Sequence, residues 1–296
     1  MPEGDTVLRT ARRLHAVFAG ERLTRAELRW GSLDDEPLQG ACTLEVAARG
    51  KHILHRFDSG ITLHSHLRME GRWEVKAPDD APKSGTQMSR DTPVRAILAT
   101  AQWVAVGYRL GMLDLVATAH EHTLVGHMGP DILGGDWNED VAVANLTRSS
   151  KTVGAALLDD RILAGIGTLY SSESLFLERI HPWLPAASMT EDELRRVVRR
   201  AQRLLLANLD HAVQSTTGVR RSGHSTYVHA RVGHPCRRCG DTIRVASIGT
   251  APFTRPMFYC PHCQGGLAPH DDGSGQAPLG ASKRRHLPPR RGSYGR

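Results

Sequence analysis

Four cysteines constrain this chain more than any other feature of its sequence. They form two Cys-x-x-Cys pairs, Cys236/Cys239 and Cys260/Cys263, in "HPCRRCGDTIRVASIGTAPFTRPMFYCPHCQ". Two residues inside each pair let both thiolates reach one tetrahedral ion, and the residues between the pairs read as two short strands and a turn. We recognise no export signal, so the grouping favours a metal over disulfides. The pattern predicts one structural Zn²⁺ with no open coordination position.

A glycine-interrupted segment, "LLDDRILAGIGTLYSSESLFLERI", predicts a helix, a tight turn and a second helix. Gly165 and Gly167 break the apolar pattern, and Thr168 is placed to cap the second helix, whose N–H groups would then face a phosphate. Dinucleotide binding is excluded, because no strand precedes GIG, a third glycine is missing and no acidic residue follows at the required distance. We therefore expect no redox or nucleotide cofactor. A plain helical hairpin remains the alternative.

The first 118 residues predict a strand-rich unit behind one helix. Residues 5–18 carry apolar side chains at steps of three and four, and Gly20 stands where a helix would stop. Short alternating segments then follow, separated by turn-forming residues. No helix-length pattern interrupts them, so an antiparallel sandwich is favoured over a parallel sheet. His64 and His66 alternate on one of these strands and are interpreted as structural, not as metal ligands.

Composition and charge divide the remaining chain into four segments. Residues 119–130 read as a linker, 131–228 as a helical unit, 229–267 as the four-cysteine finger and 268–296 as a disordered basic tail. Of the net charge of +7, six positive charges lie in residues 281–296, so the body is nearly neutral. Residues 190–209 predict a helix with a capping box at Thr190 and Glu193. Its arginine-rich face is either solvated, which is the commoner case, or a DNA contact.

The start of the chain, "MPEGDT", raises a chemical question. Once Met1 is removed, Pro2 carries a free secondary amine. An α-amino group titrates near 7.7–8.0 in model peptides, whereas a lysine amine titrates near 10.4. The positive end of the following helix disfavours the ammonium form further. Many chains nevertheless begin Met-Pro for no catalytic reason, so the hexapeptide alone decides nothing.

Taken together, these motifs resemble the formamidopyrimidine-DNA glycosylase/endonuclease VIII family, and "PEGDT" is closer to the endonuclease VIII branch. The resemblance covers about residues 2–265. It implies an α+β multidomain fold: an N-terminal β-sandwich with an N-terminal helix, a helix–two-turn–helix domain and a C-terminal zinc β-hairpin. It also implies base excision repair by a bifunctional DNA glycosylase and AP lyase. The enzyme would act on oxidised bases, with pyrimidines expected from the branch alone.

The resemblance assigns roles to individual residues of "PEG", "RGKH", "HLRMEG", "YRLG", "GIGTLYSSE" and "TRPMFYC". It implies Pro2 as nucleophile, Glu3 as general acid/base and Lys51 as a DNA-contacting helper of catalysis. The other implied residues are Met69 as a plug for the void left by the extruded base, Arg109 and Leu110 on a probing loop, Gly167 and Thr168 at the helix turn, Glu173 as a recurrent acid, and Arg255 on the zinc hairpin. Met69 and Leu110 each have a packed core residue as their alternative.

One departure from the family pattern is Thr168, where the family usually has asparagine. Threonine has a shorter reach and lacks the two amide donors, which puts the usual phosphate contact in doubt. We expect a cytoplasmic, nucleoid-associated monomer that binds double-stranded DNA with oxidised bases or abasic sites, and no membrane. Two alternatives remain: a non-catalytic damaged-DNA-binding protein on the same scaffold, and a zinc-ribbon nucleic-acid adaptor.

Overall fold

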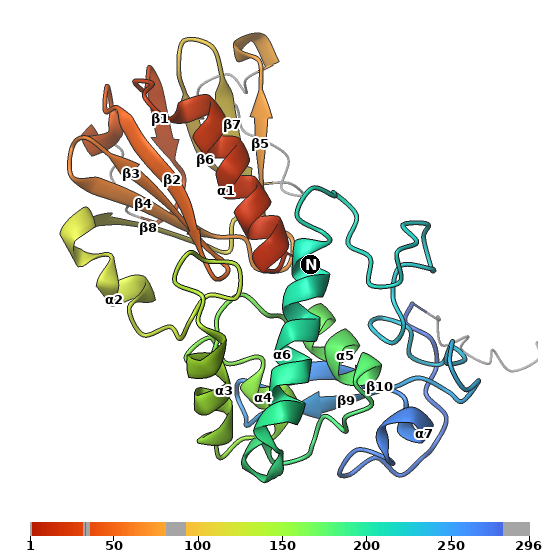
Figure 1. The fold of residues 1–296 in the computed structure, drawn as a ribbon. Coiled ribbons are helices and arrows are strands. Elements are labelled where there is room, and N and C mark those ends of the chain that lie inside the picture. Colours follow the sequence, from red (N-terminus) through yellow and green to blue (C-terminus); the bar gives the residue numbers. More distant parts are fainter. Residues whose placement is uncertain (1, 32, 34–35, 81–92, 281–296) are drawn as a thin grey trace, which may run out of the picture.

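The computed structural model describes residues 2–31, 33, 36–80 and 93–280. The chain builds a strand-rich half, drawn in red to yellow in Figure 1, and a helical half, drawn in green, against which a blue hairpin packs. Among these described residues, no helix is both long enough and apolar enough to cross a bilayer. The sequence also predicts a loop rich in Pro, Ser, Gly and Asp around residues 77–93, and residues 81–92 of it lie outside the described residues.

Helix α1 opens the strand-rich half and spans Gly4–Phe18. Its buried side chains recur every three or four residues, as the sequence predicts, and they pack against strand β2. Gly20 follows with a φ of 82° and ends the helix. The helix therefore fixes Pro2 and Glu3 at its N-terminal end, where the two halves meet (Figure 1).

The predicted sandwich is confirmed. Among the described residues of the sandwich, every paired strand is antiparallel to its neighbour, and two four-stranded sheets have the orders β1-β6-β7-β5 and β2-β3-β4-β8. Apolar side chains from both sheets and from α1 share one core. The strands are β1 (Arg25–Leu28), β2 (Thr43–Arg49), β3 (His52–Phe57), β4 (Ile61–His66), β5 (Arg72–Lys76), β6 (Val94–Ala99), β7 (Val104–Tyr108) and β8 (Met112–Ala117). The 3₁₀ turns are Glu36–Leu38, Pro78–Asp80, Thr118–His120 and Ala186–Ser188.

The helical half has a core of its own, built mainly around α5 and α6. The helices are α2 (His122–Val125), α3 (Glu139–Thr147), α4 (Val153–Ala156), α5 (Thr168–Leu177) and α6 (Glu191–Leu206). The expected first helix, in the segment that begins at Leu157, is wrong. Helix α4 ends at Ala156, just before that segment, and residues 157–167 form turns and one bridge at Ala164. The Asp159 carboxylate accepts the main-chain N–H of Arg161 at 3.0 Å, which gives the backbone a local alternative to the helix.

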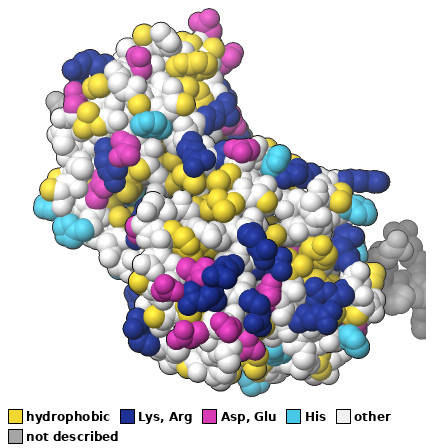
Figure 2. Space-filling view, in the orientation of Figure 1, with side chains coloured by type: hydrophobic (Ala, Val, Ile, Leu, Met, Phe, Trp, Pro, Cys, Tyr) yellow, Lys and Arg dark blue, Asp and Glu magenta, His cyan; other side chains and the backbone are white. Residues whose placement is uncertain are grey.

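Helix α6 has the predicted capping box, because Thr190 and Glu193 each accept the other's main-chain N–H. Its arginines form ion pairs with neighbouring acids: Arg195 and Arg199 with Glu139, and Arg200 with Glu178. Basic and acidic side chains are accordingly interleaved over the helical half in Figure 2. These ion pairs favour the solvated interpretation of this arginine face, and the alternative of a DNA contact stays a prediction.

The zinc-finger segment contains the predicted two strands, β9 (Arg244–Ile248) and β10 (Arg255–Tyr259), followed by α7 (Pro261–Gln264). The guanidinium of Arg238 stacks on the ring of Phe176 at 4.3 Å and donates to the carbonyl of Phe176 at 3.1 Å. Because Arg238 lies between two of the cysteines, this contact fastens the finger to the end of α5.

The prediction of a disordered tail from residue 268 needs correction. Asp271 forms a buried ion pair with Arg244, and its carboxylate also accepts the Tyr259 hydroxyl at 2.6 Å. The side chain of Gln276 bonds both the N–H and the C=O of Val245, at 2.9 and 3.0 Å. Residues 268–280 are therefore fixed to the hairpin by polar contacts, which a composition low in apolar side chains does not reveal. The basic residues 281–296 lie outside the described residues.

Candidate active site at the domain boundary

The carboxylate of Glu3 caps helix α5 from 164 residues away in the sequence. It accepts the main-chain N–H groups of Gly167, Leu169 and Tyr170 at 2.7, 2.7 and 3.3 Å. A Cβ at position 167 would lie 2.5 Å from the Glu3 carboxyl carbon, so only glycine permits this approach. The helix N-terminus, expected to face a phosphate, thus holds a protein carboxylate instead, and Thr168 is buried with 5% of its surface exposed.

Burial sets the protonation of Glu3. Its exposed fraction is 1%, and desolvation raises its pKa from 4.5 to about 7. The N–H groups of Leu169 and Gly167 oppose this shift, Asp5 adds to it, and the positive charge of Lys51 opposes it. A carboxyl group that titrates near neutral pH both gives and takes protons readily, which is what general acid–base catalysis requires.

Lys51 reaches the same place from the turn between β2 and β3. Its Nζ donates to the carbonyl of Ile166 at 2.9 Å and forms an ion pair with Asp160. The preceding N–H, of Gly50, donates to the buried carboxylate of Asp131 at 2.7 Å. Two carboxylates from the helical half therefore hold this turn of the sandwich. Sequence reasoning missed both, since only the fold brings residues 131 and 160 next to residue 51.

Pro2 is half-buried and lies directly before this arrangement. The N–H of Gly4 donates to the carbonyl of Gly165 at 2.9 Å, and a Cβ on Gly4 would lie only 2.9 Å from that oxygen. The start of the chain is thereby fastened to the glycine turn. Removal of Met1 would leave a secondary amine on the residue before Glu3, a proton carrier on which the charge of Lys51 acts.

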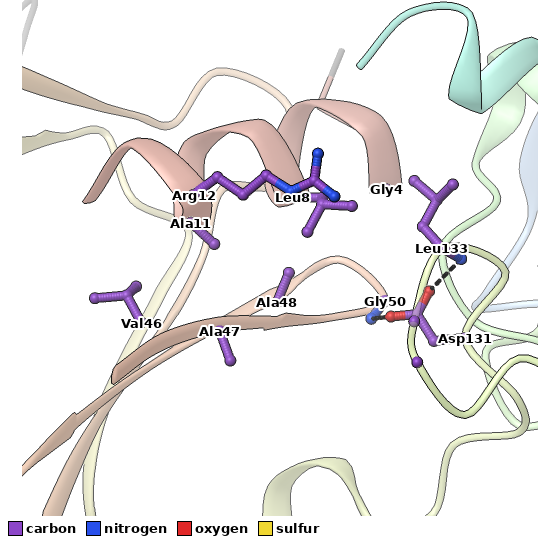
Figure 3. A pocket seen from close by; sticks show the side chains of 12 residues that line it. Gly4, Leu8, Ala11, Arg12, Val46, Ala47, Ala48, Gly50, Asp131 and Leu133 are labelled. Carbon is purple, nitrogen blue, oxygen red and sulfur yellow. Dashed lines mark hydrogen bonds between the residues drawn. The ribbon is translucent and has the colours of Figure 1, made fainter. Parts of the chain in front are cut away.

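A cavity of about 210 Å³ lies beside this centre, between α1, β2 and the loop at residues 131–135. Figure 3 shows its lining, with the Asp131 carboxylate bonded to Gly50 and Leu133 at one end. Most of the lining side chains are small or apolar, and neither Glu3 nor Lys51 contributes to it. The cavity is therefore a gap in domain packing, separate from the catalytic groups.

Two loops of the sandwich, the one after β4 and the one between β7 and β8, contact each other. The N–H of Gly111 donates to the carbonyl of His66 at 2.9 Å, and Arg109 forms an ion pair with Glu70. Met69 is 66% exposed, a position that suits the expected plug. Leu110 is 2% exposed and belongs to the sandwich core, which agrees with its alternative as a packed core residue. Its side chain fills the space above Gly107.

Glu173 is the structural acid that the resemblance implied. It is fully buried and accepts the N–H groups of Tyr227, Val228 and His229 at 2.7–3.1 Å, as well as the hydroxyl of Thr216. Burial raises its pKa, and these four donors oppose the shift. One side chain thus fixes both ends of the loop 216–229 against α5.

Asp114, His64 and His52 form a hydrogen-bonded chain, and the ring of His66 packs edge-on against His52. His64 contacts Asp114 at 2.9 Å and His52 at 2.7 Å, and His66 accepts the N–H of Arg68 at 2.9 Å. Burial lowers the pKa of His52 to about 2 and that of His66 to about 4, so both rings are neutral. Within the part of the chain that the structure describes, these histidines form no group with metal-ligand spacing.

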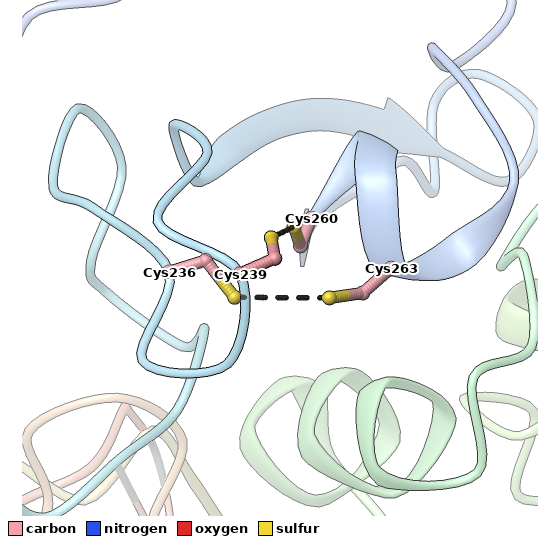
Figure 4. Close-up of side chains that lie close together, drawn as sticks. All are labelled: Cys236, Cys239, Cys260 and Cys263. Carbon is pink, nitrogen blue, oxygen red and sulfur yellow. Dashed lines mark hydrogen bonds between the residues drawn. The ribbon is translucent and has the colours of Figure 1, made fainter.

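The four cysteine sulfurs do form such a group, and they lie within 4.8 Å of one another. The Sγ atoms of Cys236 and Cys263 are 3.9 Å apart, and those of Cys239 and Cys260 are 3.5 Å apart (Figure 4). Tetrahedral zinc with Zn–S bonds of ~2.3 Å needs S–S separations of about 3.8 Å. The site fits a Zn²⁺ ion closely. Arg255 is exposed on the same hairpin, two residues after Phe253, which is 76% exposed.

Comparisons with known proteins agree with this geometry. Residues 1–105 match the family model "Formamidopyrimidine-DNA glycosylase N-terminal domain", and residues 128–220 match "Formamidopyrimidine-DNA glycosylase H2TH domain". A "Probable endonuclease 8 2" of Streptomyces coelicolor is 46% identical over 274 residues, which cover 92% of this chain and 97% of that protein. The chain belongs to the formamidopyrimidine-DNA glycosylase/endonuclease VIII family.

One further relative and one solved structure show what else this chain is similar to. The "DNA-(apurinic or apyrimidinic site) lyase Nei2" of Mycolicibacterium smegmatis is 38% identical over 265 residues, covering 89% of this chain and 99% of that protein. A crystal structure of Lactococcus lactis formamidopyrimidine DNA glycosylase, non-covalently bound to DNA with an AP site, matches the fold. Its TM-score is 0.71 at 23% identity, with 89% of this chain and 100% of that chain covered. The resemblance to the formamidopyrimidine-DNA glycosylase/endonuclease VIII family, predicted from the motifs, is confirmed. Its closer similarity to the endonuclease VIII branch is confirmed as well.

Proposed function

We propose that this protein is a bifunctional DNA glycosylase and AP lyase of base excision repair, with Pro2 as the nucleophile. The names of its relatives, endonuclease 8 and AP lyase, support both activities. The observation that carries the proposal is the position of Pro2 next to a buried Glu3 whose pKa is about 7, with Lys51 anchored alongside.

The chemistry needs an amine at the sugar. A secondary amine that bonds to C1′ displaces the base and then forms an iminium ion, which carries a permanent positive charge and acidifies the C2′ proton. Loss of that proton breaks the strand by β-elimination, and a second elimination releases the remaining sugar. Glu3 is the group that exchanges protons with the sugar oxygen, and Lys51 supplies positive charge at the same place.

The substrate we propose is double-stranded DNA that carries oxidised bases, with pyrimidines preferred, or abasic sites. The preference rests on the likeness to proteins named endonuclease 8. The target base must leave the stack, which costs a few kcal/mol. An exposed Met69 offsets part of that cost if it fills the vacated space, while Arg109 faces the orphaned partner base.

We also propose that the four cysteines hold one Zn²⁺, since their spacing fits that ion. The ion would fix the hairpin that presents Arg255 to the phosphate backbone, and four thiolates leave it no position for a substrate. For the protein as a whole we propose action as a monomer, in the cytoplasm with the nucleoid, where its DNA substrate lies.

Borohydride trapping tests the proposal. With an oligonucleotide carrying one abasic site, we expect a reduced covalent adduct, and mass spectrometry should place it on the peptide that begins with Pro2. A chain that keeps one extra residue ahead of Pro2 is the matched control and should give no adduct. An adduct elsewhere in the chain, or a fully active extended chain, would overturn the assignment.

A further inference from the structure

A second buried carboxylate lies two residues after Glu3. Asp5 is 0% exposed in the first turn of α1. Its oxygens accept the hydroxyl of Tyr170 at 2.8 Å and the side-chain amide of Gln214 at 2.9 and 3.0 Å. These donors come from α5 and from the segment after α6. Asp5 is therefore held by contacts with segments distant in sequence, and not only by its place in the first turn of α1.

Asp5 and Glu3 share one partner residue. The main-chain N–H of Tyr170 donates to Glu3 at 3.3 Å, and its hydroxyl donates to Asp5. The phenol is held in its protonated form, because burial and then the charge of Asp5 raise its pKa. Tyr170 therefore binds both carboxylates, that of Glu3 through its main-chain N–H and that of Asp5 through its hydroxyl. Both carboxylates are buried.

Burial raises the pKa of Asp5, and its neutral donors Gln214 and Tyr170 oppose this shift because they stabilise the anion without cancelling its charge. The nearest cation on α1, Arg9, donates instead to the carbonyls of Asn208 and His211. The charged or titratable groups that act on this pair are Arg9 and Tyr170 on Asp5, and Lys51 on Glu3. Both carboxylates are buried, and the negative charge of Asp5 is one of the causes that raise the pKa of Glu3, because a like charge in a buried environment disfavours a second anion.

We propose that Asp5 is a positioning residue, which keeps Glu3 carrying its proton until the sugar ring opens. This rests on the proposed function. In the ring-opening step, the lone pair of the Pro2 nitrogen forms the second C1′–N bond, the C1′–O4′ bond breaks, and O4′ takes the proton from Glu3. The products are an iminium cation, a hydroxyl and the Glu3 carboxylate, so charge and atoms balance. Asp5 touches none of the reacting atoms.

The test is the pH dependence of single-turnover trapping on abasic DNA, from pH 5 to pH 9, for the wild type and Asp5→Asn. Asparagine keeps the size and an acceptor oxygen but removes the charge. We expect the falling alkaline limb to move to lower pH by about one pH unit, which is about a tenfold loss of rate at pH 8 with little change at pH 5. Asp5→Ser, which also removes the charge, should move the limb in the same direction and replaces Asp5→Asn if that variant does not fold.

Glu173→Gln is the matched control, because Glu173 is a fully buried carboxylate on α5 whose hydrogen bonds go to Thr216 and residues 227–229, not to Glu3 or Lys51. It should leave the limb in place. An equal rate loss at every pH in the Asp5 variants would show a purely structural role and overturn the inference. Failure of the wild type to form a Pro2 adduct would instead refute the proposed function, so the two failures are distinguishable.

Discussion

The raised pKa of Glu3 predicts a measurable cost in stability, and replacing this residue with glutamine reveals it. Glu3→Gln keeps the shape of the side chain and one acceptor oxygen for α5, but it removes the titration. The variant should lose the proton transfers of catalysis. Its free energy of unfolding should depend less on pH than that of the wild type.

The magnitude follows from the two pKa values of Glu3. The folded value is about 7 and the ordinary value is 4.5. One pKa unit corresponds to ~1.4 kcal/mol, so the difference amounts to about 3 kcal/mol. Because the folded pKa is raised, the stabilisation is fully present only below the ordinary pKa of 4.5, and it is lost as the pH rises through 7. At pH 8, the wild type should have lost about 3 kcal/mol relative to Glu3→Gln.

Equilibrium urea unfolding of both proteins at pH 4.5, 6, 7 and 8 measures this directly. The quantity of interest is the difference between wild type and variant at each pH, in which the contributions of Asp131 and Glu173 cancel, whereas that of Asp5, which acts on Glu3, remains in the difference. We expect that difference to change by about 3 kcal/mol across the range, in favour of the variant at high pH. Parallel pH profiles for the two proteins would refute the reasoning.

Three further predictions concern the loops, the finger and the tail. Leu110→Ala should lower the free energy of unfolding by ~2–5 kcal/mol, whereas Met69→Ala should leave that free energy nearly unchanged and slow base excision. Urea unfolding measures the first effect and single-turnover excision measures the second. A Leu110→Ala protein as stable as the wild type would contradict the core assignment. Cys260→Ser, or strong chelation of metal, should weaken DNA binding in a gel-shift assay while the strand-rich half keeps its circular dichroism signal. Unchanged binding after verified metal loss would argue against a role for the finger in binding. Residues 281–296 contain six Lys or Arg side chains, and deleting them should reduce the slope of log K for DNA binding against log salt concentration by at most about 5. Fluorescence anisotropy on undamaged duplex DNA measures this slope. An unchanged slope would mean that the tail does not contact DNA.

Local spacing was sufficient wherever a feature depends on residues close in sequence. The capping box of α6 joins positions three apart, and each cysteine pair joins positions three apart, so the pattern itself fixes the geometry. The same holds for the alternation of the sandwich strands and for the apolar stripe of α1. The family resemblance then added roles for Pro2 and Glu3 that spacing alone does not contain.

The sequence by itself determined the elements, the metal-ligand set and the chemistry that an N-terminal proline offers. Only the tertiary structure decided that Glu3 caps α5, that Asp160 and Asp131 hold the Lys51 turn, that Leu110 lies in the core and that residues 268–280 are anchored to the hairpin. The physical reason is that burial and desolvation arise where segments distant in sequence meet. A pattern read along the chain shows which groups can ionise, but the packing around them sets the pH at which they do.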